Sequence, residues 1–352
     1  MEIRKFGVTE KGEETSLITL KNSKGMTAEL TDMGASLVSL IVPDRDGKPV
    51  DVVLGYPTSE AYEHNANCFG ATIGRNGNRI ANGHFVINGK EYQMVRHPLN
   101  GHNLHSQPDT FYTRKWGFTT EDGPDAECVT FTLYSPDGDQ GFPGNMDIEV
   151  TYTLTEDNEL MIDYYGFCDQ DTVMNMTNHS YFNLNGEGSG DILGHEVQLY
   201  SDYITETDSG LIPTGNLTDV TGTPFDFREA KSIGQDIDQD DEALHNGLGY
   251  DHNFVVNGGK RQEDAQLIGR VKGDQSGIVM EIYTDLPGVQ MYTSNGMEQP
   301  NGKNGHAYHN HAGVCFETQF APNAVNIPAF ESPVIKANKE VTTLTVYRFV
   351  AE

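Results

Sequence analysis

Apolar and polar residues alternate with a period of two over much of this chain. The clearest alternation involves Val129, Phe131 and Leu133 in one segment, followed by Ile148, Val150, Tyr152 and Leu154 in the next. A period of two places one set of side chains on a packed face of a strand and the other on a wet face. Further strands are predicted at 27–42, 52–54, 195–200, 278–283, 289–293 and 341–350.

Turn and cap residues between these segments predict the local connections. The pair Asn88-Gly89 stands between two alternating segments, which is the strongest short-range signal for a β-hairpin. We expect Thr58 to cap one short helix that extends to Asn65. The segments 214–222 and 236–249 are rich in Asp, Gly and Asn, so both are predicted to be loops.

The whole pattern predicts an all-β protein. Many short alternating strands without long crossover helices cannot form a parallel sheet. We therefore expect a large antiparallel β-sandwich with few short helices. No linker, low-complexity tract or internal repeat divides the sequence, so residues 1–352 are predicted to form a single domain.

Charge and cysteine content restrict the classes of partner. Acidic residues number 52 against 23 basic ones, a formal net charge of −29, which repels nucleic acid and anionic membrane surfaces. No apolar run approaches the roughly 18–20 residues that span a bilayer, and the N-terminus leads into polar sequence rather than a signal core. The four cysteines form no CxxC pair, which favours reduced thiols in a cytoplasmic protein.

The segment 177–184, Thr-Asn-His-Ser-Tyr-Phe-Asn-Leu, carries the strongest chemical signal. It places His179 among polar side chains and two aromatic rings. Histidine titrates near neutrality, so a positioned imidazole can give or take a proton. Far downstream, Glu317 lies between apolar residues, where a carboxylate must be paired or face a polar cavity. These two residues are candidates for a general acid and a general base.

Three other clusters supply candidate ligand-binding groups: 74–80 with Asn and Arg, 97–105 with three histidines, and 249–254 with Asp251 between two rings. The glycines of the first cluster do not have the spacing of a phosphate-binding loop. The histidines at 97, 102 and 105, and those at 306, 309 and 311, lack the spacing of a zinc site, so no metal is expected. Donors and acceptors of this kind suit a neutral polyol, and proton transfer on a sugar is the predicted chemistry.

Together these motifs resemble those of the aldose 1-epimerases, also called galactose mutarotases. The resemblance extends from Gly34 to Phe349 and rests on segment 177–184, on Gly-Tyr-Asp-His-Asn-Phe at 249–254, on Pro-Gly-Val-Gln at 287–290 and on Glu-Thr-Gln at 317–319. It implies a large antiparallel β-sandwich that interconverts the α and β anomers of free hexoses such as glucose and galactose. It also implies that the enzyme uses neither a metal nor an organic cofactor.

The resemblance also implies roles for particular residues. His179 matches the family's general acid and Glu317 its general base. The sugar-binding positions fall on Asn78, Arg79, His105, Asp251 and Gln290.

Departures from the family pattern leave alternatives open. Ser106-Gln107 stands where the family usually has Gly-Gly, which affects the shape of the loop and the sugar preference. A related fold that acts on phosphorylated hexoses would need a cationic cluster, for which only Arg75, Arg79 and Arg96 are available. A sugar sensor without catalysis is a further alternative. The expected partner is a monosaccharide substrate, and both a monomer and a homodimer remain possible.

Overall fold

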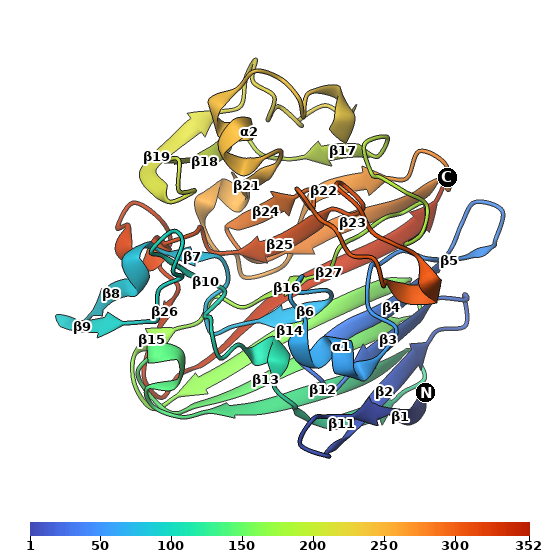
Figure 1. Cartoon of the computed structure of the whole chain (residues 1–352), viewed down its shortest axis with the longest axis horizontal. Coiled ribbons are helices and arrows are strands. Elements are labelled where there is room, and N and C mark those ends of the chain that lie inside the picture. The colour runs from blue at the N-terminus through green and yellow to red at the C-terminus, as the bar shows by residue number, and fades with distance from the viewer.

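The computed structural model describes residues 1–352, and nearly all of its regular structure is antiparallel sheet (Figure 1). The largest sheet has nine strands, in the order β11 (Gly117–Asp122), β12 (Ala126–Ser135), β13 (Met146–Thr155), β14 (Glu159–Cys168), β27 (Glu340–Ala351), β23 (Ile278–Thr284), β22 (Gln266–Lys272), β17 (Glu196–Leu199) and β20 (Lys231–Ser232). Buried residues alternate strictly with more exposed ones along β13, as the period of two predicted, and the same alternation continues along β14.

Two five-stranded sheets and four strand pairs complete the architecture. One sheet runs β1 (Glu2–Val8), β2 (Glu14–Lys21), β3 (Thr27–Thr31), β4 (Ser36–Pro43) and β5 (Pro49–Asp51). The other runs β19 (Pro213–Asp219), β18 (Tyr203–Thr207), β21 (Asp251–Val255), β24 (Gly288–Tyr292) and β25 (Cys315–Gln319). The pairs are β6 (Ala71–Ile73) with β16 (Thr177–His179), β7 (Arg79–Ile80) with β10 (Asn103–Leu104), β8 (His84–Ile87) with β9 (Lys90–Gln93), and β15 (Thr172–Val173) with β26 (Val334–Ile335).

The sheets pack face to face around a shared apolar core. One cluster of 53 buried residues draws on all three large sheets, with Ile18 from the first, Val150 from the nine-stranded sheet and Phe316 from β25. Between β27 and β25, the Tyr347 hydroxyl donates a hydrogen bond to the Phe316 carbonyl at 2.8 Å. Side chains interdigitating between stacked sheets define a β-sandwich, so the predicted fold class is confirmed.

Helices are few and short, as predicted. The helices α1 (Ser59–His64) and α2 (Glu242–Gly247) have six residues each. Single 3₁₀ turns lie at η1 (Ala81–Gly83), η2 (Phe111–Thr113), η3 (Asp139–Gly141), η4 (Ile233–Gln235), η5 (Asn257–Gly259), η6 (Lys303–Gly305) and η7 (Ala324–Asn326). No helix reaches the length and apolarity that crossing a membrane requires.

Two predicted local features are confirmed, one with a correction. Asn88 and Gly89 join β8 and β9 with φ values of 52° and 78°, the double positive φ of a type I′ hairpin turn. The helix expected to extend to Asn65 is α1. Thr58 stands at its N-cap position, but its side chain makes no capping hydrogen bond, so that part of the prediction was wrong.

Three other local predictions were wrong. Segment 214–222 is largely strand β19, an edge strand that pairs only with β18 and is therefore mostly exposed and polar. Segment 236–249 contains α2, whose N-cap Asp241 accepts hydrogen bonds from the backbone N–H groups of Ala243 and Leu244. Residues 52–54 form no strand, and Val53 makes only an isolated bridge with Phe182. In each case the pairing or capping partner, rather than local hydrophobicity, decides the conformation.

Candidate active site

Glu317 lies on β25, whose five residues are all buried. Because side chains alternate along a strand, Phe316 joins the apolar core while Cys315, Glu317 and Gln319 face the opposite side. The neighbouring strands have the same division, and the ladder places Asn253, Gln290 and Glu317 abreast across β21, β24 and β25. The sandwich thus presents a row of polar side chains on the face of this sheet away from the core.

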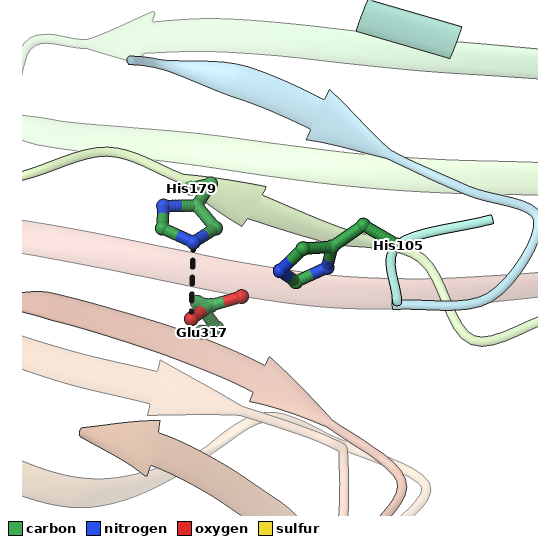
Figure 2. Close-up of side chains that lie close together, drawn as sticks. All are labelled: His105, His179 and Glu317. Carbon is green, nitrogen blue, oxygen red and sulfur yellow. Dashed lines mark ion pairs between the residues drawn. The ribbon is translucent and has the colours of Figure 1, made fainter. Parts of the chain in front are cut away.

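His179 reaches the same space from a different part of the chain. It ends the short strand β16, where it pairs with Ala71 of β6. Its Nε2 atom lies 3.6 Å from Glu317 Oε1, and both side chains are buried. Figure 2 shows the imidazole ring and the carboxylate pointing toward each other, with His105 directed at the same space from another segment. The fold therefore brings together two residues that are 138 positions apart in the sequence.

Burial sets the protonation of this pair. Desolvation lowers the pKa of His179 to about 4 and raises the pKa of Glu317 well above its usual value. Both shifts favour the neutral pair, a protonated Glu317 carboxyl beside a neutral His179 ring. The Asp251 carboxylate adds to the rise in the pKa of Glu317, which Arg79 opposes, whereas a backbone hydrogen bond and Asp251 both raise the pKa of His179 against desolvation. The pair therefore favours one proton on the Glu317 carboxyl beside a neutral His179 ring.

Two hydrogen bonds join His105 and Asn78. The backbone N–H of His105 donates to the Asn78 carbonyl at 3.0 Å, and the backbone N–H of Asn78 donates to His105 Nδ1 at 3.1 Å. Both residues adopt positive φ, 52° for His105 and 58° for Asn78. Because Nδ1 accepts, the neutral His105 ring carries its proton on Nε2, and burial holds its pKa well below the usual value. His105 therefore offers a fixed donor to a ligand.

Arg79, Asp251 and Gln290 form a connected group at the edge of the site. Arg79 Nη2 lies 3.2 Å from Asp251 Oδ2, and the Gln290 amide donates to Asp251 Oδ1 at 2.7 Å. Gln319 Nε2 in turn donates to Gln290 Oε1 at 3.1 Å and to Asn253 Oδ1 at 3.0 Å. This chain of amides holds the Asp251 carboxylate in one orientation.

A cavity of about 250 Å³ opens above these residues. Six of the seven predicted site residues line it, namely Asn78, Arg79, His105, His179, Asp251 and Glu317. Gln290 does not line it but lies buried behind Asp251. Oε2 of Glu317 is buried and has no hydrogen-bond partner. An unpaired buried carboxylate oxygen is costly, which agrees with the raised pKa of Glu317.

Other lining residues were missed by sequence reasoning. They are Ala66, Asn67, Cys68, Leu104, Gln107, Tyr181 and Tyr292. Tyr181 follows His179 by two positions, and Tyr292 follows Gln290 by two. The period of two could therefore have assigned both rings to the site face. Residues 66–68 carried no comparable signal, because they lie outside any strand.

One buried group has the residue types of a metal site. Ligand atoms of His105, His179 and Glu317 all lie within 4.8 Å of one another. A metal-bound histidine normally donates its second ring N–H to an acceptor. Nδ1 of His105 instead faces a backbone N–H donor, which keeps the proton on Nε2. The hydrogen bonding of His105 thus does not fit metal coordination at Nε2.

Arg75 does not belong to the site, although it lies in the same sequence cluster as Arg79. Its guanidinium is completely buried and donates to Ser135, Pro143, Thr172, Pro136 and Gly144. Of the three arginines considered for a phosphate group, Arg79 alone lines the cavity. The structure therefore offers no cationic cluster for a phosphorylated hexose.

An acid/base pair beside a small polar cavity in an antiparallel sandwich defines a class of enzyme that moves protons on a polyhydroxylated ligand. The model of the aldose 1-epimerase family matches residues 16–348. Galactose mutarotase from Mus musculus is 38% identical over 351 residues, which cover 98% of this chain and 97% of that protein. Aldose 1-epimerase from Escherichia coli K12 is 36% identical over 344 residues, 97% of each chain.

A solved structure has the same fold. The aldose epimerase homologue from C. elegans superimposes with a TM-score of 0.85 at 31% sequence identity, covering 96% of this chain and 99% of that one. The chain belongs to the aldose 1-epimerase family.

Proposed function

We propose that His179 and Glu317 are the acid and base with which this aldose 1-epimerase interconverts the α and β anomers of free hexoses such as glucose and galactose. The observation that carries the proposal is their geometry. His179 Nε2 and Glu317 Oε1 lie 3.6 Å apart beside the cavity, and Glu317 Oε2 is unpartnered. No other group of the site combines a proton donor and a proton acceptor in this way.

Ring opening begins once the proton of the pair has moved from Glu317 to Nε2 of His179, which leaves Glu317 ionised. The Glu317 carboxylate removes the proton from the anomeric hydroxyl, the C1–O1 bond becomes a carbonyl, and the C1–O5 bond breaks. His179 gives its Nε2 proton to O5. Rotation about C1–C2 then exposes the other face of the aldehyde, and closure with the two roles reversed gives the opposite anomer. Each positioned proton transfer typically contributes about 10²- to 10⁴-fold.

The remaining residues orient the sugar. Arg79 and His105 supply N–H donors, while the carboxylate of Asp251 accepts hydroxyl protons. Gln290 acts through Asp251, because its amide reaches that carboxylate rather than the cavity. A cavity of about 250 Å³ lies just below the range of about 300–1,000 Å³ for drug-sized ligands, which favours a monosaccharide over a larger saccharide.

Three wider features belong to the same proposal. Residues 1–352 act as one domain, a view supported by the apolar core that the three large sheets share. The four free cysteines support a cytoplasmic location. One chain supplies all seven of the predicted site residues, and the protein functions as a monomer or a homodimer.

Polarimetry of freshly dissolved α-glucose and α-galactose tests the activity. We expect the optical rotation to relax faster with the protein than in buffer, in proportion to protein concentration. Relaxation at the buffer rate for every common aldose would contradict the proposal. Sugar binding without faster relaxation would instead identify a sensor.

A further inference from the structure

The thiol of Cys315 lies against the ring of His179, on the side opposite Glu317. Its sulfur is 3.5 Å from Nδ1, and both side chains are buried. Cys315 stands two positions before Glu317 on β25, so alternation directs both side chains to the same face of the sheet. One strand therefore supplies a contact to each nitrogen of the His179 ring.

The proposed reaction determines which nitrogen must carry a permanent proton. Nε2 exchanges its proton with O5, so Nε2 must be bare after ring opening. The neutral ring must then carry its proton on Nδ1. Which nitrogen of a histidine is protonated is set by the hydrogen bond that the other nitrogen makes. An acceptor at Nδ1 is therefore required, and the structure places the Cys315 sulfur there.

We propose that Cys315 is a positioning residue of the reaction: its Sγ accepts the Nδ1–H of His179 and holds the ring in the tautomer whose Nε2 is free to exchange the substrate's proton. This inference rests on the proposed function of His179. A backbone hydrogen bond of His179 itself also raises the pKa of the ring. Burial keeps the thiol protonated, because its pKa is raised well above the usual value.

The chemistry of sulfur explains why a thiol suits this place. A neutral thiol is a weak acceptor, so it fixes the tautomer without greatly stabilising the imidazolium ion. A carboxylate in the same position would hold the proton on the ring and make it a poor acid. In the resting arrangement the protonated Glu317 carboxyl faces Nε2 at 3.6 Å, and Nδ1–H donates to Sγ.

Charged and titratable groups around the ring must be considered for any pH effect. On β25 these are Cys315 and Glu317, and elsewhere in the chain they are Cys68, Arg79, His105, Tyr181, Asp251 and Tyr292. Among these groups, Cys315 alone is within hydrogen-bonding distance of Nδ1. A substitution at Cys315 therefore changes the Nδ1 contact and leaves the other groups in place.

The tautomer is measured directly by the ¹⁵N chemical shifts of His179 in the full-length protein. We expect a protonated Nδ1 and a bare Nε2 in the wild type at neutral pH, and a mixture of tautomers in Cys315→Ala. A wild-type ring protonated on Nε2 would overturn the proposal. This measurement does not depend on turnover, so it separates failure of the inference from failure of the proposed mutarotase activity.

Kinetics supply the second test. Cys315→Ala should lower kcat by between about two- and tenfold, the range that one neutral hydrogen bond supports, with little change in KM. Cys315→Ser restores an acceptor, so it should recover most of kcat and shift the acid limb of the pH profile upward, because a hydroxyl stabilises the imidazolium better. The matched control is Cys168→Ala, a buried free thiol remote from the cavity. Equal kcat and equal tautomers in Cys315→Ala and the wild type would refute the role.

Discussion

Arg75 and Arg79 are four positions apart, yet their guanidinium groups have different surroundings: Arg75 is completely buried, whereas Arg79 is partly exposed. All three nitrogen atoms of the Arg75 guanidinium donate to protein acceptors, at distances of 2.8 to 3.2 Å. Arg79 has only Asn78 and Asp251 as side-chain partners and lines the cavity. Nearby, Oε2 of Glu317 has no partner at all.

The difference shows how a structural polar cluster is distinguished from a binding site. A buried guanidinium has five N–H donors to satisfy, and the protein satisfies them around Arg75 with carbonyl and hydroxyl groups. Around Glu317 the protein leaves capacity unused, although unsatisfied buried groups cost free energy. Hydrogen-bonding capacity left open in a cavity is what a sugar hydroxyl can complete.

Substitution of Glu317 should produce the largest effect on activity, and it tests whether the His179–Glu317 pair is catalytic. Glu317→Gln keeps the shape of the side chain but removes the base, so kcat should fall on the order of 10²- to 10⁴-fold. Polarimetry measures the loss, and His179→Ala should produce a loss of the same order. Retained activity in either variant would remove that residue from the proposed pair.

The same variant should be no less stable than the wild type. Folding raises the pKa of Glu317, so its contribution to stability is fully present below the ordinary value of 4.5 and is lost as the pH rises through the folded pKa. Glutamine has no such loss. The difference in Tm between Glu317→Gln and the wild type should therefore grow in favour of the variant as the pH is raised.

Substitution of Arg75 tests whether this arginine stabilises the fold and takes no part in sugar binding. Arg75→Met leaves several buried acceptors unpaired, and each costs about 1–3 kcal/mol, so the free energy of unfolding should fall by at least about 3 kcal/mol. Urea denaturation measures this. Arg96→Met, at an exposed arginine, should change stability by no more than about 0.5 kcal/mol. Wild-type stability in Arg75→Met together with weakened sugar binding would place Arg75 in the site instead.

The sequence predicted the fold well where local pattern decides it. The period of two identified β12 and β13, and the Asn-Gly pair identified the β8–β9 hairpin. It failed for β19, whose exposed edge has no apolar face to reveal it. That strand is held by its partner β18, and pairing between distant segments leaves no trace in local hydrophobicity.

The site was predictable as a set of residues but not as an arrangement. The family resemblance singled out Arg79, but residue type alone does not distinguish it from Arg75, because the difference lies in which distant segments surround each guanidinium. The support of Gln290 by Gln319 depends on the register of β24 and β25. The tautomer of His105 depends on the backbone of Asn78. Each of these facts is tertiary.

The pH profile of kcat/KM should show the smallest effect, and it reports the protonation states of His179 and Glu317. The dependence of kcat/KM on pH reports the ionisation of the free enzyme, and the active form holds one proton on the pair. Below about pH 4, His179 gains a second proton, so kcat/KM should fall by about tenfold per pH unit. At high pH, Glu317 loses the shared proton and the rate falls again.

The spontaneous rate at each pH is subtracted, and circular dichroism confirms that the protein stays folded near pH 4. An acid limb near 6.5, the ordinary value for histidine, would show that His179 is solvated in the working enzyme. His179 would then exchange its proton with bulk water, and the proton would not be held between His179 and Glu317. An acid limb near 4 would instead show that desolvation lowers the pKa of His179 in the working enzyme, so that the protonated ring releases its proton readily.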